Sequence, residues 1–379
     1  MIKKILVLLI GQLLFNCVVH AGITAIPAPP GIKANAYLLQ DFNSGKILAS
    51  NNIDQKIPPA SLTKMMTVHV VSAELVSGRI TQDDEVLISE KAWKTPGSRM
   101  FIEVNKKVSV GDLLKGVIIQ SGNDASVALA EHVSGSEEVF AELMNQYASK
   151  LGMTNSHFMN STGLPDEQHY TTAKDMAILA DAVIRDAPEI YALHSVKEFT
   201  FNKITQQNRN RLLWRDPGVD GIKTGHTEAA GFCLVASAKK ENMRLISVVM
   251  GAESEGVRSK ATQSLFGYGF RFYETQKLYA ANEGITSVKI WKGDTEELVL
   301  GLDADLYVTF PRGQKNQLRT EFNLFEKYIA PVGKGNVQGS LKIVLASEDI
   351  ADAKLISLQS VSEGSVIVRL KDNFRLLFE

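Results

Sequence analysis

The stretch Pro58–Thr67 reads PPASLTKMMT and contains a serine and a lysine three residues apart, Ser61 and Lys64. On a helix this spacing places both side chains on one face, within hydrogen-bonding reach. A serine hydroxyl is a poor nucleophile until a base removes its proton. A lysine is such a base only when burial or a second cation lowers its pKa. The spacing alone decides nothing, because Ser237 and Lys240 repeat it.

A second short motif, Ser121-Gly122-Asn123, follows an apolar stretch that predicts a helix ending just before it. The hydroxyl of Ser121 can pass a proton between Lys64 and a leaving amine. The amide of Asn123 has both a donor and an acceptor, so it can hold a substrate amide and orient Lys64. An isolated Ser-Gly-Asn is also a common turn, so this prediction depends on the other motifs.

The third motif, Lys223-Thr224-Gly225, places an ammonium next to a hydroxyl, an arrangement that suits a carboxylate. Lys223 is also the second cation that would lower the pKa of Lys64. Gly225 has no Cβ, so a substrate backbone can approach it closely. With the three motifs in this order, the sequence predicts an acyl-transfer site built on Ser61 and a neutral lysine.

The composition excludes several other classes of function. The 379 residues include 41 basic and 42 acidic side chains, a balance that does not suit a nucleic-acid backbone. Hydrophobic residues make up 45% of the chain, enough for the cores of two or three domains. The sequence has no HExxH string and no cluster of His and Cys, so we expect neither a metal nor another cofactor.

Residues 1–21 have the pattern of a secretory signal peptide. Two lysines open the segment, residues 5–15 are mostly apolar, and Val19 and Ala21 fit cleavage before Gly22. An uncleaved membrane anchor is the alternative, although the apolar run is short for a membrane span.

Cleavage at that point would remove Cys17 and leave one cysteine, Cys233, which cannot form an internal disulfide. Cys233 lies in an alternating apolar run, so we interpret it as a core residue rather than a nucleophile. A lipoprotein interpretation of Cys17 is disfavoured, because Asn16 precedes it where a small residue is needed.

Turn and capping signals divide residues 22–283 into an opening hairpin, several helices and a second hairpin. Asn43-Ser44-Gly45 marks the first turn, Gly78 ends a helix, and Thr171-Thr172 offers N-cap chemistry. The expected strands cover 36–41, 46–49, 231–238 and 244–250. The expected helices cover about 61–78, 111–119, 124–133, 137–151 and 172–185.

Beyond residue 283 the pattern changes to short strands separated by turns such as Gly293-Asp294. This change predicts a small all-β domain over residues 284–362, after a motif-bearing domain over 22–283. The strands expected in the small domain cover 287–291, 297–300, 306–310, 341–345 and 355–358.

The end of the chain, residues 363–379, predicts a short amphipathic helix. The apolar side chains that would share one helix face are Ile367, Leu370, Phe374, Leu377 and Phe378. The basic side chains off that face are Arg369, Lys371 and Arg375. Such a helix suits adsorption to an anionic membrane surface, and packing of the tail on its own domain is the alternative.

The extended strings around the three motifs, Pro58–Thr67, Gln120–Ala125 and Asp220–Thr227, are specific. With the late β domain and the tail, they resemble the low-molecular-mass penicillin-binding proteins, specifically the secreted serine-type D-alanyl-D-alanine carboxypeptidases of peptidase family S11. The resemblance covers nearly the whole mature chain. It implies an α+β fold, with a penicillin-binding protein/β-lactamase-like transpeptidase domain followed by a small all-β domain. In the first domain an antiparallel sheet would be covered by helices and joined to a helical subdomain.

The resemblance also implies a reaction. The penultimate D-Ala carbonyl of a peptidoglycan pentapeptide would acylate Ser61, terminal D-Ala would leave, and water would deacylate the enzyme. The backbone N–H groups of Ser61 and His226 would form the oxyanion hole. By position, Arg258 resembles the family arginine at the substrate carboxylate, and Arg209 resembles a second arginine near the site. The catalytic residues implied are Ser61, Lys64 and Ser121, and the substrate-binding residues are Asn123, Lys223, Thr224, Gly225, His226, Arg258 and Arg209.

The partners that follow from the resemblance are peptidoglycan stem peptides, β-lactam antibiotics as covalent inhibitors, and a membrane surface contacted by the C-terminal helix. No nucleic acid is expected. The leader and the tail together place the protein in the periplasm, attached peripherally to the outer face of the inner membrane.

Two other functions stay open at this point. Class A β-lactamases have Ser-Asp-Asn as the second motif and a deacylating glutamate before the third. Here the second motif is Ser-Gly-Asn, and Asp166 and Glu167 do not have the local setting of that glutamate. A slow-turnover acyl complex with penicillin is therefore expected rather than rapid hydrolysis. The other alternative is a largely structural cell-wall-binding protein, which the intact Ser61, Lys64 and Lys223 argue against.

Overall fold

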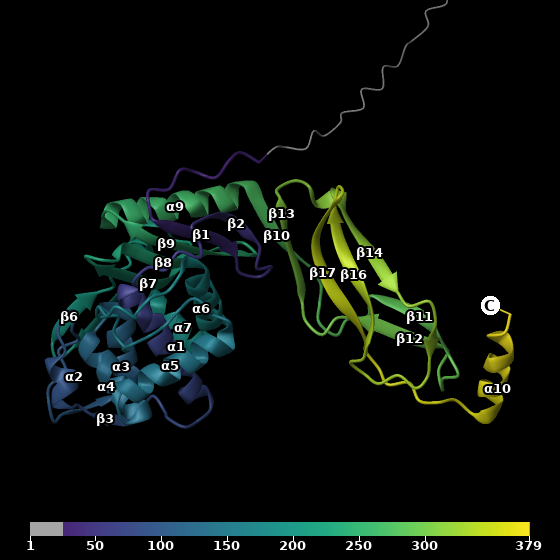
Figure 1. Cartoon of the computed structure of the whole chain (residues 1–379), viewed down its shortest axis with the longest axis horizontal. Coiled ribbons are helices and arrows are strands. Elements are labelled where there is room, and N and C mark those ends of the chain that lie inside the picture. The colour runs from purple at the N-terminus through teal and green to yellow at the C-terminus, as the bar shows by residue number, and fades with distance from the viewer. Residues whose placement is uncertain (1–25, 379) are drawn as a thin grey trace, which may run out of the picture.

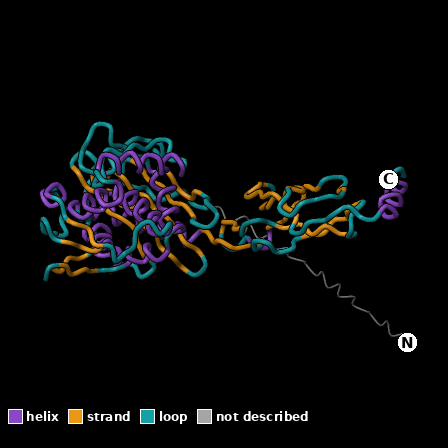
Figure 2. The backbone as a smooth tube through the Cα atoms, turned by 90° about the horizontal axis from the view of Figure 1, so that it is seen from below, coloured by secondary structure: helices purple, strands orange, loops and turns teal. Residues whose placement is uncertain are grey.

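The computed structural model describes residues 26–378, so the predicted signal peptide lies outside the described residues. Figure 1 shows a large unit of helices and strands, a smaller unit of strands, and a helix, α10 (Val366–Arg375), at the C-terminal end. In the view turned by 90°, the two units lie side by side and α10 is farthest from the large unit (Figure 2). This is the α+β fold that the sequence predicts, with the all-β unit second.

The large unit is built on a five-stranded antiparallel sheet in which both faces are covered by helices. Its strand order is β2 (Ile47–Asn51), β1 (Ala36–Asp41), β9 (Met243–Ala252), β8 (Gly231–Lys240) and β7 (Val219–Thr227). Cys233 and Val235 point into the core shared with the helical subdomain, whereas Leu234 and Ala236 pack against α9 (Glu255–Phe272). This alternation with a period of two explains why strands buried on both faces are apolar almost throughout.

Most of the helices lie on the face of the sheet opposite α9 (Figure 1). They are α1 (Lys64–Val76), α2 (Glu90–Lys94), α3 (Val110–Lys115), α4 (Asn123–Ser134), α5 (Glu137–Leu151), α6 (Ala173–Asp186) and α7 (Pro188–Tyr191), with 3-10 turns at Ala60–Thr63 and Ala192–Ser195 and a π-helical turn at Gly116–Gln120. The short helix α8 (Leu212–Arg215) instead packs Leu212 and Leu213 into the core on the α9 side. Two small hairpins pair β3 (Glu85–Leu87) with β4 (Lys107–Ser109) and β5 (Glu198–Phe201) with β6 (Ile204–Gln207).

Local sequence signals place several of these elements correctly. The range predicted for α5 agrees at both ends with the helix, whose N-cap Ser136 accepts a hydrogen bond from the backbone N–H of Val139. The hydroxyl of Thr172 caps α6 in the same way by accepting from Asp175. Both caps satisfy N–H groups that a helix leaves unpaired in its first turn.

Several features differ from the sequence prediction, and three of them bear on the site and the sheet that holds it. The predicted helix from Ser61 is a 3-10 turn followed by α1, which begins at Lys64. The third motif lies inside strand β7, which the sequence pattern did not predict. Helix α9 was also missed, because its glycines and alternating polar residues give it a weak amphipathic pattern.

The smaller unit has its own apolar core, formed by side chains such as Leu298, Phe310 and Leu341. Its six-stranded sheet has the order β14 (Leu318–Leu324), β16 (Val337–Leu345), β17 (Glu348–Ser357), β12 (Glu297–Gly301), β11 (Thr286–Trp291) and β15 (Tyr328–Ile329). A 3-10 turn at Lys315–Gln317 precedes β14. A separate pair joins β10 (Tyr273–Tyr279) to β13 (Leu306–Pro311). The expected domain boundary at residue 284 therefore falls after β10, a strand whose partner belongs to the smaller unit.

Hydroxyl groups and one carboxylate connect the two units. Thr275 of β10 donates a hydrogen bond to Asp41 of β1 at 2.7 Å, and the hydroxyls of Ser44 and Thr309 lie 2.6 Å apart. Thr275 and Thr309 also contact each other at 2.7 Å. The first hairpin of the large unit is thus held against the β10–β13 pair.

The C-terminal helix α10 exposes its apolar face. Ile367 is 79% exposed and Phe374 is 64% exposed, whereas Asp372 accepts a hydrogen bond from the backbone N–H of Lys292 at 2.6 Å. The apolar stripe is therefore not packed on the smaller unit. Among residues 26–378, no helix is long and apolar enough to cross a membrane.

Candidate active site

Ser61 and Lys64 lie where the 3-10 turn passes into α1, and the ammonium of Lys64 is fully buried. The Nζ atom of Lys64 is 3.2 Å from Ser61 Oγ, 2.7 Å from Asn123 Oδ1 and 2.5 Å from the carbonyl oxygen of Thr162. The last two atoms can only accept hydrogen bonds. A neutral lysine would donate its two N–H bonds to them, which leaves its lone pair for the hydroxyl proton of Ser61.

The electrostatic surroundings of Lys64 favour that neutral form. Burial and the nearby guanidinium of Arg209 lower the pKa of Lys64 to about 7, while Asp124 and Glu137 oppose this shift. An ammonium in bulk water titrates roughly three units higher. Near neutral pH, a large fraction of the molecules would therefore have Lys64 in the form that can accept a proton.

The second motif lies at the end of the π-helical turn that follows α3. Ser121 has a φ of 67°, a left-handed conformation that is uncommon for a residue with a Cβ. Its hydroxyl accepts a hydrogen bond from Lys223 Nζ at 2.9 Å. Asn123 donates from Nδ2 to the carbonyl oxygen of Pro96 at 2.6 Å, and this contact turns Oδ1 toward Lys64.

The third motif lies in β7, which is an edge strand of the sheet. Burial, together with the cations of Lys64 and two arginines, lowers the pKa of Lys223 well below its usual range. The expected role for Gly225, room for a substrate backbone, stays a prediction, and the structure adds a second reason for a glycine there. A Cβ at this position would lie 3.0 Å from the carbonyl oxygen of Pro59 and 3.2 Å from Leu62 Cγ. Glycine is needed because the turn that holds Ser61 packs directly on the strand.

A cleft of about 640 Å³ opens beside Ser61. The predicted residues that line it are Ser61, Ser121, Thr224, Gly225, His226, Arg209 and Arg258. The other three, Lys64, Asn123 and Lys223, are buried and do not line it. The structure thus brings all ten predicted residues to one place, seven along the cleft and three beneath its surface.

The two arginines differ in how firmly they are held. Arg258 of α9 is 6% exposed and donates to the carbonyl oxygens of Gly225 at 3.3 Å and Cys233 at 3.4 Å. Its Nε has no hydrogen-bond partner within the described residues. Arg209 donates to the carbonyl oxygen of Gln120 at 3.0 Å and lies between the second and third motifs. With these two arginines in its lining, the cleft favours an anionic group.

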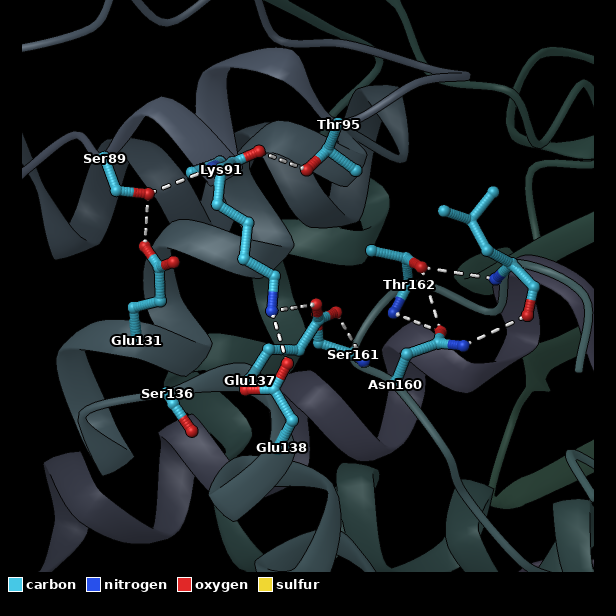
Figure 3. A network of polar contacts seen from close by, with 12 residues as sticks. Ser89, Lys91, Thr95, Glu131, Ser136, Glu137, Glu138, Asn160, Ser161 and Thr162 are labelled. Atoms are coloured by element: carbon cyan, nitrogen blue, oxygen red, sulfur yellow. Dashed lines mark hydrogen bonds and ion pairs between the residues drawn. The ribbon is translucent and has the colours of Figure 1, made fainter.

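The sequence prediction missed Thr162, whose contribution is a backbone carbonyl and so leaves no mark in the sequence. The side chain of Asn160 shapes this segment by accepting from the backbone N–H of Thr162 at 3.1 Å (Figure 3). It also accepts from the backbone N–H of Gly163 at 2.7 Å. Asp166 and Glu167 line a different groove. Among residues 26–378, no group of His, Cys, Asp and Glu side chains could hold a metal ion.

Comparisons with known proteins agree with this geometry. The family model described as D-alanyl-D-alanine carboxypeptidase matches residues 23–254, and the model of the C-terminal domain of penicillin-binding protein 5 matches residues 273–363. The D-alanyl-D-alanine carboxypeptidase DacC of Escherichia coli (strain K12) is 46% identical over 357 residues, covering 92% of this chain and 89% of that protein.

Solved structures give the same assignment. Penicillin binding protein 5 from Haemophilus influenzae has a TM-score of 0.86 and 45% identity, covering 89% of this chain and 100% of the other. Penicillin-Binding Protein D2 from Listeria monocytogenes in the ampicillin-bound form has a TM-score of 0.59 and 30% identity, covering 64% of this chain and 100% of the other. The resemblance predicted from the motifs is confirmed, and this chain belongs to the D-alanyl-D-alanine carboxypeptidase family, peptidase S11.

Proposed function

We propose that this protein is a serine-type D-alanyl-D-alanine carboxypeptidase that removes the terminal D-Ala from peptidoglycan pentapeptides. The observation that supports this most directly is the contact set of Lys64, in which two acceptors leave only the Ser61 hydroxyl as a proton source. Relatives and family model both bear the name of this activity rather than that of a β-lactamase.

In the acylation step, Ser61 Oγ attacks the penultimate D-Ala carbonyl while its proton moves to Lys64 Nζ. The negative charge that develops on the carbonyl oxygen would be held by the backbone N–H groups of Ser61 and His226. The proton then reaches the departing D-Ala amine through Ser121, whose hydroxyl Lys223 already holds at 2.9 Å. In deacylation a water molecule attacks the ester and Ser61 recovers its proton.

The free carboxylate of the terminal D-Ala would bind at the end of the cleft formed by Thr224, Arg258 and Arg209, with the ammonium of Lys223 beneath it. A carboxylate here would raise the pKa of Lys223 by supplying the missing counter-charge. Asn123 is the residue proposed to hold the substrate amide. Selection of a substrate with a C-terminal carboxylate follows from this cluster of cations.

We also propose that the protein acts outside the cytoplasm, on the periplasmic side of the inner membrane. The relatives are named D-alanyl-D-alanine carboxypeptidases, and the peptidoglycan substrate proposed for this activity lies outside the cytoplasm, which supports the location. The leader of residues 1–21 would provide export and is expected to be cleaved before Gly22. The apolar face of α10, with Ile367 79% exposed, would adsorb to the membrane surface.

β-Lactams are the proposed covalent inhibitors, because ampicillin is bound in the related Listeria protein. Slow release is expected because Asp166 and Glu167 line another groove and are not positioned to activate a water at Ser61. Rapid and complete hydrolysis of penicillin would favour the β-lactamase alternative.

The test is release of D-Ala from a pentapeptide by the purified mature protein, with Ser61→Ala as the matched control. We expect release by the wild type and none above background by the variant. Intact mass after exposure to benzylpenicillin, followed by peptide mapping, should place one adduct on Ser61. No release by the wild type, or equal release by Ser61→Ala, would overturn the proposal.

A further inference from the structure

Two segments of the chain hold Lys64 in place, and they approach it from different sides. One contributes the carbonyl oxygen of Thr162, in the segment between α5 and α6. The other contributes Asn123, at the start of α4. Any group that fixes both segments also fixes the direction in which the lysine lone pair points.

The Thr162 segment is tied to helix α5. The carboxylate of Glu137 accepts hydrogen bonds through Oε1 from the backbone N–H of Ser161 at 3.1 Å and from its hydroxyl at 2.7 Å. From the other side, Thr67 of α1 donates to the carbonyl oxygen of Ser161 at 2.7 Å. Figure 3 shows Glu137 reaching Ser161, next to the Asn160–Thr162 turn. Glu137 therefore holds the residue immediately before the carbonyl that binds Lys64.

The Asn123 segment is tied to the same carboxylate through α2. The second oxygen of Glu137, Oε2, lies 3.2 Å from the ammonium of Lys91. The carbonyl oxygen of Lys91 accepts from the hydroxyl of Thr95 at 2.8 Å, which closes the end of α2. The next residue, Pro96, supplies the carbonyl that accepts from Asn123 Nδ2 at 2.6 Å.

We propose that Glu137 is a positioning residue for the catalytic lysine, because its two carboxylate oxygens fix the two segments that present the acceptors of Lys64. Glu137 does not touch Lys64, Ser61 or the cleft, so it acts through Thr162 and Asn123. The inference rests on the proposed function, since it matters only if Lys64 removes the proton of Ser61. Loss of Glu137 should misdirect Lys64 without removing the cations that bind the substrate carboxylate.

The neighbouring residue provides a matched control. Glu138 also contacts Lys91, at 2.7 Å, but its side chain is 75% exposed, whereas that of Glu137 is 13% exposed. Within the described residues, Glu138 has no contact with Ser161. If a surface ion pair with Lys91 were all that mattered, Glu138→Gln would slow acylation as much as Glu137→Ala does.

The experiment measures the second-order rate of acylation by benzylpenicillin, with intact mass as the readout, for the mature protein and its variants. Glu137→Ala should acylate about 10- to 100-fold more slowly, the range expected for misplacement of a catalytic group. Lys91→Met should have a smaller effect, because it removes only the Asn123 connection. Glu137→Gln should recover most of the rate, since its amide oxygen can still accept from Ser161, and Glu138→Gln should match the wild type.

A pH profile separates positioning from simple loss of folding. The charged or titratable groups that face Lys64 are Glu137, Arg209, Asp124, Lys223 and His169. Removing the negative charge of Glu137 lowers the pKa of Lys64, so the acid limb of the acylation rate should move to lower pH while the plateau falls. A residue needed only for folding would reduce the amount of active protein and leave the limb unchanged.

The outcomes are distinguishable from failure of the proposed function. If the wild type is not acylated, the proposed function fails. If the wild type is acylated and Glu137→Ala matches it in rate and pH profile, this inference alone is wrong. It is equally wrong if Glu138→Gln is as slow as Glu137→Ala. Should Glu137→Ala not fold, Lys91→Met gives the decision, because the proposal requires it to acylate more slowly than the wild type and a wild-type rate contradicts it.

Discussion

The active-site cleft and the C-terminal helix both depart from the usual distribution of side chains. The cleft buries lysines, whereas the helix exposes large apolar groups. In the large unit, the ammonium groups of Lys64 and Lys223 are 0% and 3% exposed. In α10, the apolar residues Ile367 and Phe374 are 79% and 64% exposed. Ordinary folded domains keep lysines outside and large apolar groups inside. Both regions therefore lower the stability of the isolated chain.

The difference lies in what would remove each unfavourable arrangement. A buried cation is relieved by an anion, and the cleft above Lys223 opens at Thr224 and Arg258. An exposed apolar stripe is relieved by an apolar phase, and exposed basic residues such as Lys371 and Arg375 beside it favour an anionic surface. The cleft thus fits a small carboxylate, and the C-terminal helix fits a membrane. Substitutions in the cleft should change catalysis alone, and changes to the helix should change membrane attachment alone.

The largest effect is expected at Lys64. Lys64→Met keeps the length and burial of the side chain but removes the base, so kcat for D-Ala release should fall about 10³- to 10⁴-fold. The melting temperature should stay the same or rise, because a buried amine is replaced by an apolar group. The measurements are steady-state kinetics and thermal unfolding. Retention of wild-type kcat would mean that Lys64 is not the base.

A smaller loss should follow changes to the cations at the carboxylate end. Arg258→Gln should lower kcat/KM for pentapeptide about tenfold to a hundredfold, as expected for loss of one hydrogen bond to a charged group. A substrate analogue with a C-terminal amide should show almost no further loss in the variant. If acid and amide substrates lose activity equally, Arg258 does not recognise the carboxylate.

Deleting residues 365–379 should move the protein from the membrane fraction to the soluble fraction. The activity of the truncated protein on a soluble pentapeptide should stay unchanged, because α10 lies far from the large unit (Figure 1), whose residues line the cleft. Ile367→Asn is the point variant, since it interrupts the apolar stripe and leaves the basic residues in place. Unchanged fractionation of the deletion variant would refute the anchor.

The smallest expected effect is a shift in pH dependence. Burial and Arg209 lower the pKa of Lys64 to about 7, so activity should rise with pH through that value as Lys64 loses its proton. Arg209→Gln removes one of the two causes, which raises the pKa and should move the acid limb of kcat/KM to higher pH. The shift is opposite in direction to that expected for Glu137→Ala. A limb that does not move would assign the titration to another group.

The motifs named residues that the structure gathers around one cleft, whereas the strand that holds the third motif was not predicted. Lys223 and Thr224 lie in a nine-residue strand whose glycines at 221 and 225 hide the β pattern. The carbonyl of Thr162 accepts from Lys64, and the carboxylate of Glu137 holds the neighbouring Ser161; both contacts arise only from tertiary packing. Sequence reasoning identified the side chains that gather at the cleft but not these supporting groups.

The sequence predicts a mixed α+β domain followed by an all-β domain, but the boundary between them depends on the pairing of two strands far apart in the chain. Composition changes near residue 283, yet β10 starts at Tyr273 and pairs with β13, beyond residue 305. A strand that follows a helix directly, as β10 follows α9, gives no loop signal in the sequence. We propose placing the boundary between α9 and β10, and leave the membrane role of α10 as a prediction.

The thiol of Cys233 can report transient separation of the strands in the sheet that carries the active site. Among residues 26–378 it is the only cysteine, and its thiol is free. The residue is buried in β8 opposite Gly225, and burial raises the pKa of the thiol to about 11. Alkylating reagents need an accessible thiolate, so they should modify Cys233 only in molecules whose sheet has transiently separated. The labelling rate of the mature protein would therefore measure how often the strands of this sheet separate. Slower labelling after acylation by penicillin would measure how much the acyl group tightens the strand that carries the third motif.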